Sequence, residues 1–480
     1  MPRQVVIVGA GVGGLSASIH ARLAGFEVLV VEKGSVPGGK AAGFNIAGYR
    51  LDPGPSIVIL KDIYEDLFAR AGRPIADYLR FIRLDPFTRV CFEGSDCFDL
   101  PADRKDCLDV LKARFPLDAK RMEWLMDKGD RVIGDVRRTV FARPFEHPWQ
   151  IANPSMIKVG LALGGQTPYK QVVDRWFTSP ELRAFFYGFP SYGGQTYDSV
   201  APGAFLIPYL MLSEGVYYPE GGVASIPAAL HRLGIDLGVE FRFDTTVTGL
   251  IVDRSRVRAL ETSKGPVDCD AVICNVDPYT AGAWLGRTYN LEPNLSYFTV
   301  HWGLRTNAKE LSCHTLFVPK DFESGFDQLY RQRRFPDSPI VYVNATSSVD
   351  PSSAPPGCAN VFAVATSPAI TDELDWAETA SMARQAMLKT MDKCGLSINA
   401  TDVEFEREQS PATFYERDGN YRGSLYGPVE KHRLFGMMPQ RNYDEEYRNL
   451  YYCGGSVQPG AGLPMVMLSG KFAVERLAKR

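Results

Sequence analysis

Six residues near the start of the chain, Gly9-Ala10-Gly11-Val12-Gly13-Gly14, have types and a spacing that suit the binding of a dinucleotide pyrophosphate. Gly9 permits a tight turn, Gly11 lets the backbone approach the phosphates, and Gly14 lets a helix pack closely on a strand. Glu32 follows eighteen residues after Gly14, and its carboxylate can accept hydrogen bonds from ribose hydroxyls. The pattern therefore predicts dinucleotide binding.

These residues need a strand, a helix and a second strand to position them. The short, β-branched run Gln4–Val8 predicts a buried parallel strand, and Val12–Leu23 predicts a helix whose first N–H groups face the phosphates. Phe26–Glu32 predicts the next strand, which places Glu32 at its end. Together they form a βαβ unit of the Rossmann kind.

Three further segments are expected to complete the site. Backbone at Gly38-Gly39 can run close to a long, bent ligand, while Lys40 can neutralise phosphate or lie beside a flavin ring. The backbone N–H and C=O of Val247 can read an adenine edge. A strand, a glycine turn and a helix beginning near Met467 form a second cluster of amides. The predicted cofactor contacts outside the first loop and Val247 are Glu32, Lys33, Gly38, Gly39, Lys40, Pro55, Ser56, Gly454, Gly455, Gly462, Pro464, Met465 and Val466.

With these pieces the chain resembles the phytoene desaturase family of carotenoid desaturases and isomerases, within the amine-oxidase-like FAD-dependent oxidoreductases. The resemblance spans nearly the whole sequence. It is carried by the first glycine loop, Asp52–Ser56, Gly221-Gly222, Asp350–Gly357 and the glycine-rich stretch Gly454–Gly470. Two departures occur: Met438–Asn442 shifts an expected arginine, and Ser456–Gln458 stands where threonine and histidine are common.

Segments with patterns typical of nucleotide binding alternate along the sequence with segments that lack them. This alternation predicts two interleaved domains in an α/β fold. The first is a Rossmann-like FAD-binding domain with a parallel sheet and helices, similar to glutathione-reductase-like flavoproteins, from segments 1–85, 219–285 and 410–480. The second is a mixed α+β substrate domain from segments 86–218 and 286–409. It is expected to carry a helical part that contacts a membrane.

The resemblance implies non-covalent FAD and an apolar polyene substrate, a carotenoid or its precursor. A hydride would pass from an allylic carbon to flavin N5, and oxygen or a quinone would reoxidise the flavin. An isomerase, a saturase or a terminal oxidase of the same family would share these motifs. A flavin amine oxidase and a non-enzymatic flavin- or membrane-binding protein are further alternatives.

No acid–base dyad stands out, so the catalytic residues are unassigned. His301 lies in an apolar run and is a weak candidate that a core histidine explains better, and Asp277 is interpreted as a turn former. The aromatic segments Phe185–Tyr192 and Phe205–Leu212 are expected to line the polyene pocket, touch a bilayer, or fill an ordinary core.

The composition excludes several other classes of protein. A net charge of −3 over 480 residues implies no nucleic-acid partner. The nine cysteines are scattered and form no CxxC pair, which predicts reduced thiols and no metal site. No apolar window reaches the roughly 18 residues of a membrane-spanning helix. The sequence therefore predicts a cytoplasmic enzyme, with the inner face of the cell membrane as a docking place.

Overall fold

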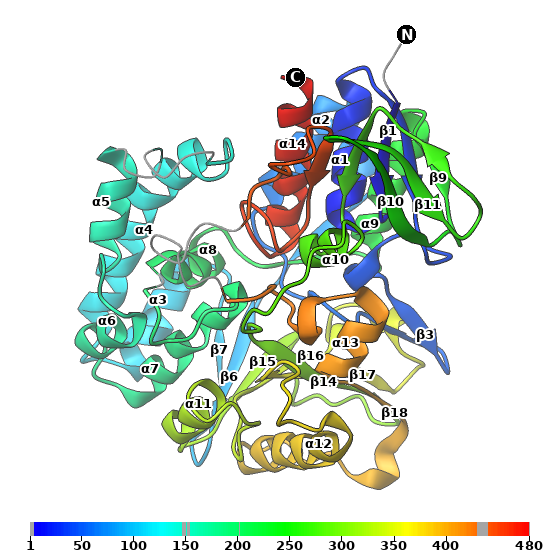
Figure 1. Ribbon diagram of the computed structural model, residues 1–480. Coiled ribbons are helices and arrows are strands. Elements are labelled where there is room, and N and C mark those ends of the chain that lie inside the picture. Colours follow the sequence, from blue (N-terminus) through cyan, green and yellow to red (C-terminus); the bar gives the residue numbers. More distant parts are fainter. Residues whose placement is uncertain (1–3, 146–149, 151–153, 201, 430–439, 480) are drawn as a thin grey trace.

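The computed structural model describes residues 4–145, 150, 154–200, 202–429 and 440–479. A parallel sheet with its helices, a second and larger sheet, and a group of helices form three adjoining parts (Figure 1). The first two parts confirm the predicted α/β class.

The parallel sheet has the order β19-β13-β1-β2-β9, so its middle strand comes from the start of the chain and its edge from the end. Its strands are β1 (Gln4–Val8), β2 (Glu27–Val31), β9 (Glu240–Arg242), β13 (Ala271–Cys274) and β19 (Leu450–Tyr452). All of them fall within the segments 1–85, 219–285 and 410–480, whose boundaries stay a prediction.

Both faces of this sheet are covered, which explains its continuous apolar strands. Val5 and Ile7 pack in one core with the helices α1 (Val12–Leu23), α9 (Ser225–Asp236) and α14 (Leu463–Ala478). Val6 and Val8 face the opposite side, where a three-stranded antiparallel sheet packs on them. That small sheet contains β10 (Val247–Asp253), β11 (Arg256–Thr262) and β12 (Val267–Asp268).

The second sheet has the order β18-β14-β17-β16-β15-β6-β7. Its pairs are antiparallel except for β15 with β6. Helix α12 (Trp376–Lys393) shares a hydrophobic core with it. The strands are β6 (Thr88–Phe92), β7 (Phe98–Leu100), β14 (Ser296–Leu304), β15 (His314–Val318), β16 (Val341–Asn344), β17 (Ala359–Ser367) and β18 (Val403–Gln409).

The helical part lies beside both sheets (Figure 1). Its helices are α3 (Arg104–Arg114), α4 (Ala119–Thr139), α5 (Pro154–Ala162), α6 (Tyr169–Trp176), α7 (Pro180–Tyr187) and α8 (Leu206–Ser213). The remaining elements are α2 (Lys61–Arg70), α10 (Pro278–Ala283), α11 (Phe322–Tyr330), α13 (Pro411–Asp418), β3 (Phe44–Ile46), β4 (Tyr49–Leu51), β5 (Phe81–Arg83) and β8 (Tyr217–Pro219).

The apolar segment Phe205–Leu212 forms part of the interior of this helical part. Phe205 and Tyr209 are buried, and Leu210, Met211 and Leu212 join them in one core cluster. The expectation that this segment touches a bilayer is therefore wrong, since its side chains are used in packing α8 on its neighbours.

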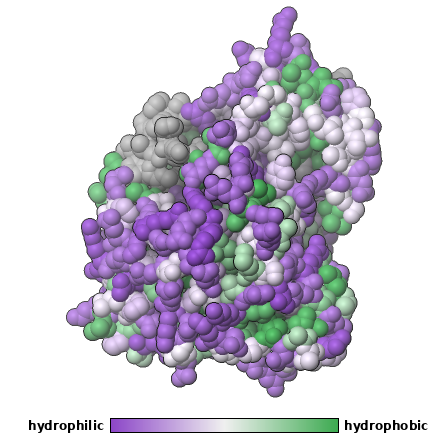
Figure 2. Space-filling view, turned by 60° about the horizontal axis from the view of Figure 1, so that its bottom comes forward, coloured by the Kyte–Doolittle hydropathy of each residue, from purple (hydrophilic) through white to green (hydrophobic). Residues whose placement is uncertain are grey.

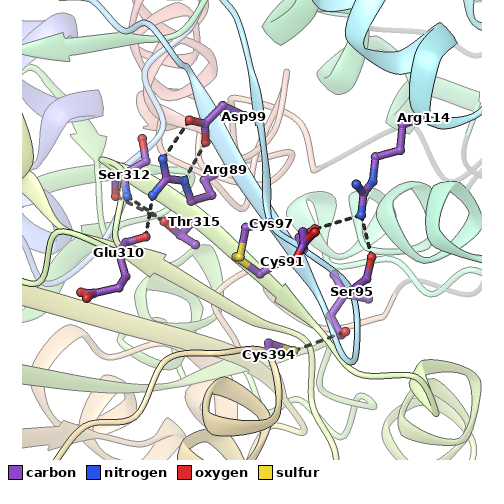
Figure 3. Close-up of a disulfide and its surroundings, with 12 residues drawn as sticks. Arg89, Cys91, Ser95, Cys97, Asp99, Arg114, Glu310, Ser312, Thr315 and Cys394 are labelled. Carbon is purple, nitrogen blue, oxygen red and sulfur yellow. Dashed lines mark hydrogen bonds and ion pairs between the residues drawn. A yellow bond between two sulfur atoms is a disulfide. The ribbon is translucent and has the colours of Figure 1, made fainter.

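Two other details correct the sequence-based expectations. Helix α14 begins at Leu463, earlier than Met467, because Pro464 fits the first turn, where no backbone N–H is needed. Cys91 and Cys97 form a disulfide across the β6–β7 hairpin, next to the paired residues Arg89 and Asp99 (Figure 3). The hairpin brings these two thiols opposite each other, which a search for CxxC spacing overlooks. The other seven cysteines are free.

Hydrophilic residues predominate on the face shown in Figure 2, and hydrophobic residues form separate patches there. Among the described residues, no helix is both long and apolar enough to span a bilayer.

Candidate functional site: a cofactor cradle closed by two chain ends

The first glycine loop joins β1 to α1 with very little space to spare. Gly9 has a φ of +98°, and its N–H donates to the carbonyl of Val31 at 2.8 Å. A Cβ on Gly14 would lie 2.1 Å from the Gly9 carbonyl oxygen. The predicted tasks of these two glycines, a tight turn and close packing of helix on strand, are thus observed.

Glu32 holds this loop in place from the end of β2. Its carboxylate accepts the N–H of Ala10 at 2.6 Å and the N–H of Gly34 at 2.8 Å. The backbone carbonyl of Glu32 accepts the N–H of Thr245 at 2.9 Å, two residues before Val247. Glu32 therefore joins the glycine loop to the strand β10 that was predicted to read adenine.

The Gly38-Gly39 segment lies directly against the first loop. Gly38 donates its N–H to the Ala10 carbonyl at 2.8 Å, and it also forms a parallel bridge with Gly11. A Cβ on Gly39 would lie 3.4 Å from the Cα of Gly11. Lys33, by contrast, points its ammonium group to the backbone carbonyl of Arg417.

Helices α1 and α14 run parallel, so their N-termini meet at one place. Ser16 donates to the carbonyl of Met467 at 2.8 Å, and a Cβ on Gly470 would lie 2.5 Å from the Gly13 carbonyl. Helix α14 has Gly462 as its N-cap with Pro464 in the first turn. Two adjacent helix N-termini present unpaired N–H groups, an arrangement that favours a bound anion.

Asn275, which sequence reasoning missed, stands between the two glycine segments. It directly follows β13, and its N–H donates to the Val8 carbonyl at 2.8 Å. Its side-chain amide would lie 2.6 Å from a Cβ on Gly11 and 3.5 Å from a Cβ on Gly454. The residue fills the gap where β1, β13 and β19 end, which only the strand order reveals.

Lys40 follows Gly38-Gly39 in the segment that lies against the first loop, and its side chain keeps accessible surface. Burial lowers the pKa of its ammonium group, and the nearby carboxylates of Asp418 and Asp277 oppose that shift. Burial raises the pKa of Asp277. Asp277 also accepts the N–H of Tyr279 at 3.0 Å as the N-cap of α10, which confirms it as a turn former.

Pro55 and Ser56 follow a segment that is fixed from both sides. A Cβ on Gly54 would lie 2.1 Å from the carbonyl oxygen of Lys40. Buried Asp52 accepts the N–H groups of Val223 and Ala224, at 2.9 and 3.1 Å, just before α9 begins. The carboxylate of Asp52 therefore fixes the segment before Pro55 to the N-terminal end of α9.

A chain of hydrogen bonds runs from Ser56 into the second sheet. Ser56 Oγ lies 2.8 Å from the hydroxyl of Tyr342, which lies 2.6 Å from Nδ1 of His314. Asn344 Nδ2 also donates to Nδ1 at 3.4 Å, so Nδ1 is an acceptor. Burial lowers the pKa of His314 to about 3; the imidazole stays neutral, and Tyr342 donates to it. Ser56 in turn donates to Tyr342.

His301 is a core residue of β14. It is fully buried, its ring stacks on Phe362 with centroids 4.5 Å apart, and Phe44 contacts its edge. Burial lowers its pKa to about 4. Backbone groups of Asp52 and Arg407 lie near the ring and partly oppose this lowering of the pKa, but neither ring nitrogen makes a well-formed hydrogen bond to a described residue. A buried neutral ring of this kind offers no route for a proton. The core interpretation of His301 is favoured.

The proline-rich loop, Asp350–Gly357, joins the second sheet to the two small two-stranded sheets β3-β4 and β5-β8. Asp350 forms an ion pair with Arg50 in β4 and accepts a hydrogen bond from Tyr218 at 3.0 Å. Asn360 donates to the Arg50 carbonyl at 2.7 Å. The contacts of Asp350 and Asn360 with Arg50 therefore hold in place the segment that precedes Ser56.

The two departures from the family pattern also have structural partners. Asn442 is buried and donates to the carbonyl of Gln458 at 2.9 Å. The Gln458 side chain pairs with both backbone groups of Phe145, at 2.6 and 2.9 Å, and so joins the cradle to the helical part. Met438 and Pro439 lie outside the described residues.

The cradle fits FAD by its chemistry. It offers two helix N-termini, backbone free of side chains at Gly11, Gly38 and Gly39, and the amino group of Lys40 in the adjoining segment. Within the described ranges, no cluster of His, Cys, Asp and Glu side chains could hold a metal ion. The contacts of the individual residues with the cofactor stay predictions.

Comparison with known proteins places the whole chain among flavoenzymes. The model of the flavin containing amine oxidoreductase family matches residues 12–478. The zeta-carotene-forming phytoene desaturase of Myxococcus xanthus is 30% identical over 99% of this chain and 94% of its own length. The 4,4'-diapolycopene oxygenase of Methylomonas sp is 29% identical over 99% and 98%. The 1-hydroxycarotenoid 3,4-desaturase of Flavobacterium sp. (strain P99-3) is 27% identical over 98% of each chain.

Solved structures confirm the fold. An oxidoreductase from Methanosarcina mazei superposes with a TM-score of 0.64 at 15% identity, over 98% of this chain and all of the other. Putrescine oxidase superposes with a TM-score of 0.63 at 15% identity, over all of both chains.

Proposed function

Since the chain belongs to the flavin containing amine oxidoreductase family, and within it to the phytoene desaturases and related carotenoid enzymes, we propose that it desaturates a long apolar polyene, a carotenoid or its precursor. The observation that carries this proposal is the end-to-end match to carotenoid desaturases, together with a complete cradle for the flavin. The same match supports an oxidoreductase that acts on CH–CH groups.

Non-covalently bound FAD supplies the two-electron acceptor for a hydride from an allylic carbon. The residues of the chain itself would bind the cofactor and orient it. The backbone at Gly11 and the N-termini of α1 and α14 would hold the pyrophosphate, and Lys40 would place a positive charge beside the cradle.

A second candidate, oxidation that inserts oxygen at the polyene end, is favoured by one specific observation, the full-length similarity to the 4,4'-diapolycopene oxygenase. Putrescine oxidase is similar in fold alone. An isomerase or a saturase would use the same cradle.

The decisive experiment supplies the purified holoprotein with a linear carotenoid in liposomes under anaerobic conditions. We expect the flavin absorbance to bleach and a more conjugated polyene to form, identified by its pigment spectrum and mass. Bleaching with a product that has gained oxygen on later exposure to air would favour the oxygenase. No bleaching with any polyene, alongside rapid bleaching with a primary amine, would exclude the desaturase.

We also propose that the protein docks on the inner face of the cell membrane, where polyenes dissolve and where a quinone competes with oxygen as electron acceptor. Helix α5 exposes Ile157 and Leu161, 50% and 71% accessible, next to exposed Lys158. An apolar face with a flanking cation suits an interface between headgroups and acyl chains. Helix α5, rather than α8, is the proposed contact.

Co-sedimentation with anionic liposomes tests this docking. The variant Leu161→Glu should reduce the bound fraction severalfold and leave the FAD content unchanged. A matched control, Leu117→Glu, changes a residue that is 80% exposed away from α5. Equal loss in both variants, or in neither, would refute α5 as the docking site.

A further inference from the structure

The hydrogen-bond chain Ser56–Tyr342–His314 has a direction, and that direction decides what Ser56 can bind. Asn344 Nδ2 donates to the carbonyl of Cys313 at 2.9 Å and to Nδ1 of His314 at 3.4 Å. Because Nδ1 accepts from Asn344, it carries no proton, and the hydroxyl of Tyr342 donates to it at 2.6 Å. The oxygen of Tyr342 then accepts from Ser56 Oγ at 2.8 Å. The proton of the Ser56 hydroxyl is thus already used, and Ser56 can offer a ligand only the lone pairs of its oxygen.

His314, at the inner end of this hydrogen-bond chain, serves as an acceptor. The side chain is buried in β15, and its protonated Nε2 has no hydrogen-bond partner among the described residues. An unpaired buried N–H costs about 1–3 kcal/mol, a cost that a leucine at this position would avoid. Burial lowers the pKa of the imidazole to about 3, so the ring takes up no proton at neutral pH. The hydrogen-bond chain therefore fixes the orientation of hydroxyl groups and does not carry a proton away from the site.

Ser56 lies where the cradle meets the second sheet. Two residues before it, a Cβ on Gly54 would lie 2.1 Å from the carbonyl oxygen of Lys40, which directly follows the Gly38-Gly39 segment of the cradle. The rest of the hydrogen-bond chain belongs to β15 and β16, in the predicted substrate domain. The edge of a flavin ring that takes up a hydride has to face the substrate. We therefore expect Ser56 to meet that edge.

A hydroxyl that can only accept distinguishes the two redox states of a flavin. The ring nitrogen that takes up a hydride has a lone pair when the flavin is oxidised and becomes an N–H when it is reduced. The oxygen lone pairs of Ser56 would repel the first and bind the second, and hydrogen bonds to ring nitrogens are a recognised means of tuning a flavin. A hydrocarbon polyene has no donor to offer, so the cofactor is the ligand that this hydroxyl suits.

We propose that Ser56 Oγ accepts a hydrogen bond from a ring N–H that the flavin has only when reduced, and that Tyr342 and His314 are positioning residues that hold the Ser56 hydroxyl in this orientation. The three residues thereby favour the reduced cofactor and raise its reduction potential. This inference rests on the FAD cradle of the proposed function and on the predicted contact of Ser56 with the cofactor.

The test measures the two-electron reduction potential of the bound FAD against reference dyes, with no polyene present. In Tyr342→Phe the Ser56 hydroxyl loses its acceptor and can turn to donate to the oxidised ring. We expect the preference for reduced over oxidised FAD to fall about tenfold, the effect of one hydrogen bond, which corresponds to a potential about 30 mV lower. Tyr330→Phe is the matched control, since it also removes a buried phenolic hydroxyl, one without a hydrogen-bond partner among the described residues, and it should leave the potential unchanged.

Three further variants separate orientation from packing. His314→Leu removes the acceptor and should lower the potential as Tyr342→Phe does. His314→Asn, whose side-chain oxygen can accept where Nδ1 did, should restore most of the potential. Ser56→Ala removes the hydroxyl through which the other two residues act, so in its background Tyr342→Phe should cause no further shift.

A potential that is unchanged in FAD-loaded Tyr342→Phe and His314→Leu would overturn the inference. So would an equal fall in Tyr330→Phe, or a Tyr342→Phe shift that is just as large in the Ser56→Ala background. Because these potentials are measured without a polyene, they support or overturn the inference even if no polyene is desaturated and the proposed function falls.

Discussion

The cofactor cradle and the hydrogen-bond chain Ser56–Tyr342–His314 adjoin each other, but they are built from different groups. The cradle uses backbone N–H groups and glycines at places where any Cβ would collide, such as Gly14 and Gly470. The hydrogen-bond chain uses two hydroxyls and an imidazole that are distant in sequence. A cradle of main-chain groups depends on the absence of side chains, whereas a chain of side-chain hydrogen bonds can change residue by residue.

The largest effect should come from adding a side chain to the cradle. In Gly14→Val, the new Cβ would meet the Gly9 carbonyl at 2.1 Å, and moving helix from strand should cost at least about 3 kcal/mol. We expect little folded protein and almost no retained FAD, measured as flavin absorbance per chain. Gly160→Ala is the control, since nothing lies within 4 Å of a Cβ there. Normal FAD retention in Gly14→Val would contradict the proposed cradle.

The next effect concerns the support of β19 at the closing edge of the cradle. Asp444 is nearly buried and forms an ion pair with Arg287 at 2.6 Å, and Tyr452 donates to it at 2.7 Å. Burial alone would raise the pKa of Asp444. These bonds outweigh burial and hold the pKa at about 2, below the ordinary 3.8. Asp444→Asn should therefore lose about 2 kcal/mol of stability at neutral pH.

The pH dependence of this loss has a definite sign. Because the folded pKa is depressed, the stabilisation by Asp444 is complete above pH 4 and is lost as the pH falls toward 2. Urea unfolding of wild type and Asp444→Asn should give curves that differ at pH 7 and converge near pH 2. A difference that persists or grows in acid would exclude the ion pair as its cause.

A smaller effect separates the hydrogen-bond chain of Tyr342 from the cradle. Tyr342→Phe removes the hydroxyl between Ser56 and His314 and leaves Nδ1 of His314 with only its weak contact from Asn344. We expect a loss of about 1–2 kcal/mol in stability and unchanged FAD content, measured by thermal unfolding and flavin absorbance. If Tyr342→Phe loses FAD as Gly14→Val does, the two regions are not separable.

The smallest effect is expected at His301. His301→Leu replaces a buried neutral ring that has no hydrogen bond to a described residue. The free energy of unfolding should therefore change by less than about 1.5 kcal/mol, and polyene turnover should persist. Loss of turnover in a folded, flavin-loaded variant would restore His301 as a catalytic candidate.

The sequence predicted features that depend on near neighbours in the chain. The helix Val12–Leu23 has the bounds that the pattern indicated, because its glycines and apolar residues act locally. The position of Asn275 between the glycine segments appears only once β13 pairs with β1 and β19, and Tyr342 reaches His314 only because β16 pairs with β15. The Cys91–Cys97 disulfide depends on hairpin register in the same way.

The parallel contact of α1 with α14 also sets a condition on the life of the protein. During translation α1 leaves the ribosome long before the residues of α14 that complete its anion site. A nascent chain or a fragment truncated before Leu463 therefore lacks half of the cradle. Flavin uptake should wait until α14 has been made: a chain without α14 remains empty and exposed to proteases, while a loaded one is stabilised by its ligand.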